Sequence, residues 1–397
     1  MQISVAHSTA KVSKEAASQT AAIVDQELDE SPDLLILYCS DGYDGQELLQ
    51  TLKDRFPDCA LQGGTSCQGV MSDAGYHSDQ GWGLGLFAIS DKAGAYGVGA
   101  AEMGEDPRQA AQEAVLQALA HAGRPGEIPD LVWLVGAPGH EEKVLEGIAD
   151  VLGPSVPVAG GSTADNEVAG NWHQFANGDV YSNSVTLSVL FPSGTVSFAF
   201  HSGYTPTETR GRVTQAGAHK AIEIDGQPAA EVYNRWTGGV IEPALNGGGN
   251  ILSSTTLFPL GREVGQVEGM SYYRLSHPDS VTPEHELTLF SEIQEGDEVV
   301  LMTGNRDSLV SRAGRVAQSA IRARQPESEG IAGALVIYCA GCMLTIQESM
   351  PEVAANLDQS LGGRPFIGTF TFGEQGCFRE GENYHGNLMI SVVIFGT

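Results

Sequence analysis

A pattern of strand, helix, buried strand, helix and glycine-rich strand end occurs three times along the 397-residue chain. Its buried strands are nearly identical in two copies, where Leu35-Ile-Leu-Tyr-Cys39 corresponds to Leu335-Val-Ile-Tyr-Cys339. The middle copy has Asp130-Leu-Val-Trp-Leu-Val-Gly136 at the same place. Continuous apolar runs bounded by turn residues are typical of strands buried on both faces. We therefore predict an α/β fold in which internally repeated strand–helix units form pseudo-symmetric mixed sheets.

The repeats also predict how the chain is divided. The first copy is expected to end at Ile89 and the second at Phe191, and the third to begin with the strand Asp297-Glu-Val-Val-Leu-Met-Thr303. Gly, Pro and alternating strand-like patterns dominate between the second and third copies. We therefore predict one module over residues 1–210, with two α/β repeats. The second module, residues 211–397, would hold a β-rich region and the third repeat.

The charge of the chain argues against several classes of protein. Only 21 Lys and Arg residues accompany 50 Asp and Glu residues, for a formal charge of −29. Nucleic-acid partners and anionic membrane surfaces both require basic residues, so neither is expected. The N-terminal residues lack the basic and apolar regions of a signal peptide, and no run approaches the roughly 20 apolar residues of a membrane helix. We expect a cytoplasmic protein whose six cysteines are reduced thiols, metal ligands or redox groups.

Three cysteines lie at strand ends of the third copy. Cys339 and Cys342 form a Cys-x-x-Cys turn after the buried strand, and Cys377 lies in the next glycine-rich turn. Two thiolates in one turn can reach a single metal, and thiolates suit zinc or an iron–sulfur cluster. Because neighbouring parallel strands end on the same side of a sheet, Cys377 is a predicted third ligand. Cys67, a histidine or an outside molecule would supply the fourth.

Two other interpretations of these cysteines stay open. Cysteine packs well as a small buried residue at a strand end, so all of these thiols can be structural. Cys339 and Cys342 can also form a reversible redox pair.

Two histidines are candidate haem ligands, because haem iron accepts imidazole in a pocket of suitable polarity. His201 lies in Phe198-Ala-Phe-His-Ser-Gly-Tyr204, and His173 lies beside Trp172 and close to Phe175. Both have aromatic neighbours that suit a porphyrin. The chain has no Cys-x-x-Cys-His sequence, so a covalently attached haem is not expected and haem b is the form predicted.

The glycine-rich strand ends are a further candidate binding site. Gly160, Gly161 and Ser162 can bind a phosphate or carboxylate through backbone N–H groups. Asp165 and Glu374 follow two such turns and can serve either as polar pocket groups or as caps. The sequence has no Gly-x-Ser-x-Gly elbow, phosphate loop or dinucleotide fingerprint, and no nucleophile–base constellation is recognisable. We therefore predict that the protein is not an enzyme.

Several motifs in fixed order resemble FIST proteins over nearly the whole chain. The N-terminal FIST module would cover roughly residues 30–220 and the C-terminal module roughly residues 220–380. The motifs that carry the resemblance are Gly160-Gly-Ser-Thr-Ala-Asp165, Arg212-Val-Thr-Gln-Ala216, Glu223-Ile-Asp-Gly-Gln-Pro-Ala-Ala-Glu-Val-Tyr233, Ala334-Leu-Val-Ile-Tyr-Cys-Ala-Gly341 and Pro365-Phe-Ile-Gly-Thr-Phe-Thr-Phe-Gly-Glu374.

The resemblance implies a sensory input module that works with intracellular signalling partners. Stand-alone bacterial members of this size are similar to the nitric-oxide-sensing NosP group, which is associated with haem and with control of a histidine kinase or cyclic-di-GMP enzyme. The family commonly has a basic residue after Cys-Ala-Gly, where this chain has Cys342. This departure creates the Cys-x-x-Cys turn.

Two hypotheses of function follow. In the first, an iron centre, either haem or an iron–sulfur cluster, reports nitric oxide or redox state to the partner enzyme. In the second, a metal-free module binds a small organic ligand, such as an amino acid, at the glycine turns. An exposed strand edge can additionally support a homodimer.

The colour of the protein tests the first hypothesis. Protein purified without oxygen is expected to be red or brown, because haem and iron–sulfur centres absorb visible light. A sharp Soret band would identify haem, and a broad band with bound iron and sulfide would identify a cluster. Colourless, metal-free protein of full stability would contradict both forms of the iron hypothesis.

Overall fold

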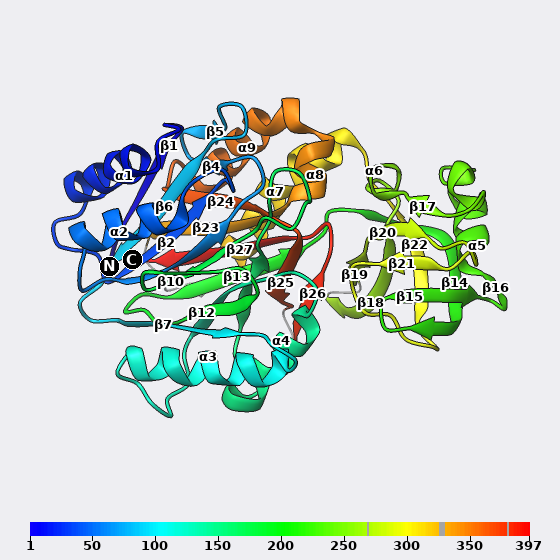
Figure 1. Cartoon of the computed structure of the whole chain (residues 1–397), viewed down its shortest axis with the longest axis horizontal. Helices are drawn as coiled ribbons and strands as arrows, with labels where there is room; N and C mark the ends of the chain where they lie inside the picture. Colours follow the sequence, from blue (N-terminus) through cyan, green and yellow to red (C-terminus); the bar gives the residue numbers. More distant parts are fainter. Residues whose placement is uncertain (268–269, 325–329, 379–380) are drawn as a thin grey trace.

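The computed structural model describes residues 1–267, 270–324, 330–378 and 381–397. Within these residues the strands form three six-stranded sheets and one nine-stranded sheet. The three six-stranded sheets make up the larger body in Figure 1, and the nine-stranded sheet makes up the lobe on the right. Each six-stranded sheet mixes parallel and antiparallel strands, which confirms the predicted fold class. No helix of the described chain has both the length and the apolar character needed to cross a membrane.

The first two repeats have the same order of elements. The first contains β1 (Gln2–Ser8), α1 (Ser13–Glu27), β2 (Leu34–Cys39), α2 (Gly45–Arg55), β3 (Ala60–Thr65), β4 (Val70–Ser72), β5 (Gly75–His77) and β6 (Leu84–Ser90). The second contains β7 (Ala95–Glu102), α3 (Pro107–His121), β8 (Leu131–Gly136), α4 (Glu141–Leu152), β9 (Val158–Ser162), β10 (Gln174–Ala176), β11 (Asp179–Tyr181) and β12 (Ser184–Phe191). Asp44 and Asp106 cap α2 and α3 by accepting a backbone N–H at 3.0 Å.

The third repeat begins with a different strand from the predicted one. Its elements are β13 (Val196–His201), α7 (Arg306–Arg322), β23 (Ile331–Cys339), α8 (Ala340–Thr345), α9 (Met350–Leu361), β24 (Phe366–Thr371), β25 (Gly373–Cys377), β26 (Asn383–Gly386) and β27 (Ile390–Gly396). The predicted first strand, β22 (Glu298–Thr303), pairs with β14 and β18 of the nine-stranded sheet instead. The prediction was wrong because β22 and β13 are both short apolar strands, and periodicity does not show which sheet a strand joins.

Residues 205–303, which we call the inserted lobe, interrupt the third repeat between β13 and α7. Its elements are β14 (Thr205–Gly217), β15 (Lys220–Ile224), β16 (Gln227–Pro228), α5 (Ala229–Trp236), η1 (Glu242–Leu245), β17 (Gly249–Asn250), α6 (Leu252–Thr255), β18 (Leu260–Val267), β19 (Met270–Ser276), β20 (Pro278–Val281), β21 (Leu287–Leu289) and β22. The module boundary expected at residues 210 and 211 falls inside the continuous strand β14. In the structure the chain leaves the α/β body just before that strand and returns after β22.

Each six-stranded sheet is completed by a β-hairpin from another repeat. Hairpin β4–β5 of the first repeat extends the sheet of the third, and β10–β11 of the second extends the sheet of the first. Hairpin β25–β26 of the third repeat extends the sheet of the second. The exchange is cyclic, so every repeat both gives and receives a hairpin. No sheet edge at β3, β9 or β24 is left open, and the three repeats form a single body.

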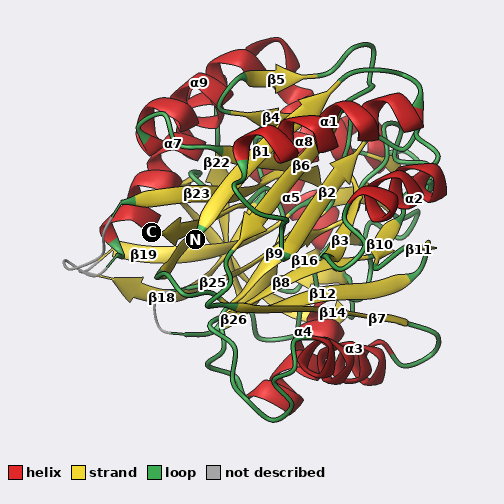
Figure 2. Cartoon of the chain, turned by 90° about the vertical axis from the view of Figure 1, so that its left-hand side faces the viewer, coloured by secondary structure: helices red, strands yellow, loops and turns green. Residues whose placement is uncertain are grey.

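The inward faces of the three sheets meet in one central apolar core. Alternate residues of the buried strands contribute to it, namely Leu34, Ile36 and Tyr38 of β2, Leu131, Trp133 and Val135 of β8, and Leu335 and Ile337 of β23. The intervening residues pack on the helices that cover the outer face of each sheet. Figure 2 shows these helices as three pairs around the sheets: α1 with α2, α3 with α4, and α7 with α9. Burial on both faces confirms the prediction made from the apolar runs.

Close approach between strands makes Gly63 of β3 a sensitive position. A Cβ atom on Gly63 would lie 1.8 Å from the Leu37 carbonyl oxygen of β2. We expect Gly63→Ala to lower the free energy of unfolding by about 1–3 kcal/mol or more, because backbone must move to admit the methyl group. Gly136→Ala is the matched control, since its Cβ would have no atom within 4 Å. Urea unfolding that gives equal midpoints for the two variants would contradict this packing.

Candidate functional site

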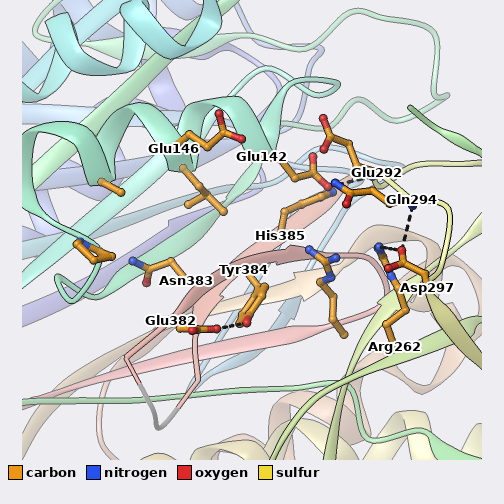
Figure 3. Close-up of a pocket in the computed structure, with 14 residues that line it drawn as sticks. Glu142, Glu146, Arg262, Glu292, Gln294, Asp297, Glu382, Asn383, Tyr384 and His385 are labelled. Atoms are coloured by element: carbon orange, nitrogen blue, oxygen red, sulfur yellow. Dashed lines mark hydrogen bonds and ion pairs between the residues drawn. The ribbon is translucent and has the colours of Figure 1, made fainter. Parts of the chain in front are cut away.

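A cavity of about 460 Å³ lies where the α/β body meets the inserted lobe (Figure 3). The body contributes α4 and the strand β26, and the lobe contributes β18, β19 and the segment before β22. Its lining is rich in charged groups: the carboxylates of Glu142, Glu146, Glu292, Asp297 and Glu382, and the guanidinium groups of Arg262 and Arg274. Five acids against two arginines leave a formal lining charge of −3. A cavity of this charge favours a ligand that carries at least one cationic group.

The two arginines of the cavity have different partners. Arg262 is buried and its Nη1 donates to Asp297 Oδ2 at 2.9 Å, so one carboxylate is already neutralised. The guanidinium of Arg274 lies 5.4 Å from the centre of the Tyr384 ring, whose hydroxyl donates to Glu382. The buried Nε of each arginine has no hydrogen-bond partner within the described chain. Both Nε atoms are enclosed, so the remaining guanidinium nitrogens are the ones that can face a ligand in the cavity.

His385 forms the floor of the cavity on β26. Gln375 Nε2 contacts its Nδ1 at 3.2 Å and also the Gly373 carbonyl oxygen at 3.3 Å. Because that carbonyl can only accept, Gln375 Nε2 is the donor, and Nδ1 of the histidine therefore accepts. The proton is then on Nε2, which is buried and has no partner in the described residues. His385 consequently presents an N–H donor beside Glu142.

Glu142 supplies the opposite charge at the same place. Its Oε1 accepts the backbone N–H of Glu292 at 3.0 Å, which ties α4 to the inserted lobe. Burial alone would raise the pKa of this carboxyl group, but His385, that N–H group and Arg274 lower it. Glu142 is therefore a charged acceptor that fits an ammonium group. Its neighbour Glu141 is already held by Ser162 Oγ at 2.7 Å and by the Gly139 N–H at 3.0 Å.

Within the described residues, one group of three side chains could hold a metal ion, namely Glu141, Glu142 and His385, whose ligand atoms lie within 4.8 Å of one another. Gln375 opposes this use, because a protonated Nε2 cannot ligate and the amide orientation is fixed by the Gly373 carbonyl. The arrangement fits an organic ligand with a carboxylate and an amine better than a metal ion.

A second cluster of polar groups is enclosed in the third repeat. Cys339 ends β23, Cys342 lies in α8, and Arg312 reaches both from α7. Arg312 is 0% exposed; its Nη1 donates to the Ser202 and Leu388 carbonyl oxygens, each at 2.8 Å. The guanidinium also lies 4.7 Å from the Tyr338 ring centre and 5.6 Å from that of Tyr204. Its Nε and Nη2 have no partner of ordinary hydrogen-bond geometry in the described chain.

A buried guanidinium is costly unless an anion lies close to it. Glu374 and Cys342 are the two candidates for that anion. Glu374 does not provide it, because burial raises the pKa of this carboxyl group well above its usual range. Burial alone would also raise the pKa of Cys342, but the hydrogen bond from Cys339, the charge of Arg312 and the Tyr204 hydroxyl lower it to about 6. Of the ionisable groups around Arg312, Cys342 is therefore the one whose charged form the surroundings favour.

The other predicted metal ligands do not join this pair. No three sulfur atoms among Cys67, Cys339, Cys342 and Cys377 lie within 4.8 Å of one another, all four being described residues. The Cys377 thiol instead contacts the Phe378 carbonyl oxygen at 3.3 Å, and burial raises the pKa of Cys67 to about 12. The structure thus brings together two of the four predicted ligands.

The two predicted haem ligands, His201 and His173, lie in different repeats of the structure. His201 Nδ1 accepts the Gly203 N–H at 2.9 Å, and its ring lies edge-on to Tyr272 at 5.4 Å. His173 donates its backbone N–H to Thr65 Oγ1 at 3.0 Å, near the first repeat. Neither histidine lines the cavity of Figure 3.

The glycine-turn residues have contacts within the fold that account for their identity. A Cβ on Gly160 would lie 1.9 Å from the Leu134 carbonyl oxygen, and one on Gly161 would lie 2.5 Å from Thr371 Cγ2, so strand packing accounts for both glycines. Asp165 accepts the N–H groups of a following turn, including those of Gly170 and Asn171 at 2.7 and 2.8 Å. Glu374 accepts the Met389 N–H at 2.9 Å. Ser162 is linked to the cavity through Gln375, whose Nε2 contacts both Ser162 Oγ at 3.3 Å and His385 Nδ1 at 3.2 Å.

Comparison with known families finds two domain models that meet inside the inserted lobe. The FIST N domain matches residues 33–227 and the FIST C domain matches residues 229–377. The chain belongs to the FIST family. FIST domains are signal-transduction sensor domains. No curated protein matches this FIST chain in sequence.

Three solved structures are similar to this FIST protein at low sequence identity. Cyanuric acid hydrolase from A. caulinodans has 11% identity and a TM-score of 0.37, with 100% of this chain and 99% of that chain covered. A second cyanuric acid hydrolase structure, described in terms of structural concatenation, has 9% identity and a TM-score of 0.36, with 99% of each chain covered. PurLQS from Thermotoga maritima has 10% identity and a TM-score of 0.24, with 77% and 72% covered.

The structure does not gather the cysteines predicted to hold an iron centre in this FIST chain. Among Cys67, Cys339, Cys342 and Cys377, all described residues, no three sulfur atoms lie within 4.8 Å of one another. His201 uses its Nδ1 within its own turn, as described above.

Sequence reasoning missed the residues that carry the most unusual chemistry. Arg312 lies between Leu309 and Val316 on the buried stripe of α7, and a charged residue on an apolar helix face is a recognisable signal. His385 was not among the candidate site residues. Arg262, Arg274 and Glu142 give no local signal, because the lobe and the body bring them together from distant segments.

The thiolate assignment predicts a pH-dependent absorbance. The ultraviolet absorbance of a thiolate should be compared between the wild-type protein and Cys342→Ser across a pH titration. The difference between the two should change in one step with its midpoint near pH 6, because the pKa of Cys342 is lowered to about 6. Since the unfolded pKa lies higher, this thiolate contributes stability that is full above the unfolded pKa and is lost as the pH falls to about 6. Cys59→Ser is the control, because burial raises the pKa of Cys59. A difference step only above pH 8 would contradict the assignment.

Proposed function

We propose that this FIST protein is a cytoplasmic sensor of a small amino-acid-like ligand, bound in the cavity between the α/β body and the inserted lobe. The observation that carries the proposal is that a guanidinium group and a charged carboxylate line the same cavity. The guanidinium group of Arg274, which lines the cavity, is the donor for a ligand carboxylate. Glu142, with its lowered pKa, is an acceptor for an ammonium group.

The charge of the lining narrows the class of ligand. Because Asp297 is paired with Arg262, Arg274 is the arginine left for the ligand carboxylate. Glu146 is paired with Arg108 and Lys143, so Glu292 and Glu382 are the further acidic groups of the lining. A ligand with more positive than negative groups balances this surface, so a basic amino acid fits better than an acidic one.

The proposal includes a signalling partner, which the FIST resemblance suggests is a histidine kinase or a cyclic-di-GMP enzyme. A ligand that contacts α4 and β26 on one side and β18 and β19 on the other would fix the lobe relative to the body. Such a change can alter a surface that the partner reads. The iron centre and its response to nitric oxide stay predictions. The lining of the cavity supports an organic ligand better than the surroundings of Arg312 support iron.

A thermal-shift screen of the twenty amino acids and simple diamines tests this function. We expect a basic amino acid to raise Tm in proportion to its occupancy. Arg274→Gln should weaken binding about 10- to 100-fold, because it removes a charge-assisted hydrogen bond worth about 1.5–3 kcal/mol. Arg55→Gln is the matched control, since Arg55 lies on α2 and pairs with Asp25 outside the cavity.

Two outcomes would contradict the proposal. One is a screen in which no compound with both a carboxylate and an amine raises Tm. The other is a stabilising compound whose affinity is equal in Arg274→Gln and Arg55→Gln.

A further inference from the structure

A second cavity, of about 420 Å³, lies where the three repeats meet. The first repeat contributes β5 and the loops that follow β3 and β5, and the second contributes the loop between β9 and β10. The third contributes the short helix η2 (Gln347–Ser349), which follows α8. We call this space the seam cavity. It shares no lining residue of the described chain with the cavity of Figure 3, so the two are separate sites.

The lining of the seam cavity is rich in neutral polar groups. It contains the hydroxyl of Tyr76 and four carboxamides, those of Gln68, Gln80, Asn166 and Gln347. A carboxamide both donates and accepts hydrogen bonds. The lining therefore suits a ligand whose own polar groups also do both.

The charge around the seam cavity disfavours an anionic ligand. Glu167 supplies a carboxylate, and no Lys or Arg of the described residues is part of the lining. Lys11 reaches the rim, where its Nζ donates to Gln80 Oε1 at 2.8 Å, but it also pairs with Asp79 at 3.4 Å. A neutral ligand meets the least electrostatic cost here.

Gln68 is held at the seam cavity by one residue from each repeat. Its backbone N–H donates to Asn166 Oδ1 of the second repeat, and its carbonyl oxygen accepts the Tyr76 hydroxyl of the first at 2.9 Å. Its Oε1 accepts from Gln347 Nε2 of the third. The backbone of Gln68 has a positive φ of 52°, a conformation that persists only where the surroundings fix it strongly. The position of this carboxamide is therefore set before any ligand binds.

Gln80 also has a backbone conformation that its residue type does not favour. Gln80 and Gly81, with φ of 54° and 86°, form a two-residue turn between Asp79 and Trp82, which exchange backbone hydrogen bonds at 2.8 and 3.1 Å. Asn, Asp and Gly are the residues preferred before glycine in a turn of this kind. Turn chemistry alone therefore does not explain glutamine, whose longer side chain lines the cavity.

The loop between β9 and β10 is strained and rigid in the same way. Val168, directly after Glu167, has a φ of 58°, although a β-branched residue rarely adopts a positive φ. Gln68, Gln80 and Val168 are three of the seven non-glycine residues of the described chain with a positive φ. The buried carboxylate of Asp165 holds the loop through backbone N–H groups at 2.7 to 3.0 Å. Strained residues gather at ligand sites, and a rigid loop loses little entropy on binding.

We propose that the seam cavity binds a neutral carbohydrate through the carboxamides of Gln68, Gln80 and Gln347. Sugar hydroxyls donate and accept hydrogen bonds, as these carboxamides do. The volume lies in the range of small-molecule sites, about 300–1,000 Å³. This site is additional to the amino-acid cavity and does not depend on it.

Saturation-transfer difference NMR of the full-length protein with D-glucose, D-galactose and N-acetyl-D-glucosamine tests the proposal. We expect at least one of these neutral sugars to bind. D-glucuronate is the charged comparator and should bind more weakly, because its carboxylate is repelled by Glu167. No binding by any of the three neutral sugars, or glucuronate binding as tightly as they do, would overturn the proposal.

Two variants locate the binding site. Gln347→Ala should weaken the sugar about 3- to 10-fold, because it removes a neutral hydrogen-bonding group. Gln80→Asn should also weaken it while Tm stays equal or rises, because asparagine suits the positive φ better but reaches less far. Gln50→Ala is the matched control, since Gln50 bonds Asp54 on α2. Affinity in Gln347→Ala or Gln80→Asn equal to that of Gln50→Ala would overturn the assignment.

Arg274→Gln separates this proposal from the amino-acid cavity. Arg274 lines only the cavity of Figure 3 among the two, so this variant should bind the sugar as the wild type does. Sugar binding that falls in Arg274→Gln and not in Gln347→Ala would place the sugar in the other cavity and overturn the seam site.

Discussion

The cyclic exchange of hairpins is the constraint on which the rest of the structure depends. Each repeat leaves one strand edge for a hairpin of another, so none of the three sheets is complete by itself. The exchange also determines where the functional groups meet. Hairpin β25–β26 of the third repeat pairs with β9 of the second, which places His385 against Glu142 at the start of α4. The cavity therefore contains residues from two repeats and from the inserted lobe.

The inserted lobe contacts the body at two places with different chemistry. At the cavity, acidic and basic groups of both parts face a shared space, and the Glu292 N–H already binds Glu142 across it. At the junction, Arg312 donates to the Ser202 carbonyl oxygen and Tyr204 donates to the Thr256 carbonyl oxygen, and these bonds hold the strand that leads into the lobe. Both contacts bear on the position of the same lobe, so a ligand in the cavity would act on an element that the junction also holds. Such convergence suits a sensor domain that reports a single output.

Much of the body could be predicted from the sequence, because its strands are buried on both faces and their apolar runs recur. Strand β13 could not be assigned to the third repeat, since residues 205–303 separate it from its helix and β22 offers a similar apolar pattern. Spacing predicted the Cys339–Cys342 pair, which the structure confirms as neighbours. It could not show that Cys67 and Cys377 lie apart from them, because those distances depend on how the hairpins pair. Gly160 and Gly161 were predicted as ligand-binding residues, whereas close strand packing explains them.

The central claim is that the cavity between the body and the lobe is the sensing site. Hydrogen–deuterium exchange of the reduced protein with and without a stabilising amino acid tests it most directly. The account predicts that ligand slows exchange on both sides of the cavity together, in α4 and β26 of the body and in β19 and the segment before β22 of the lobe. Protection on one side only, or at the glycine-rich ends of β3 and β9 instead, would contradict it.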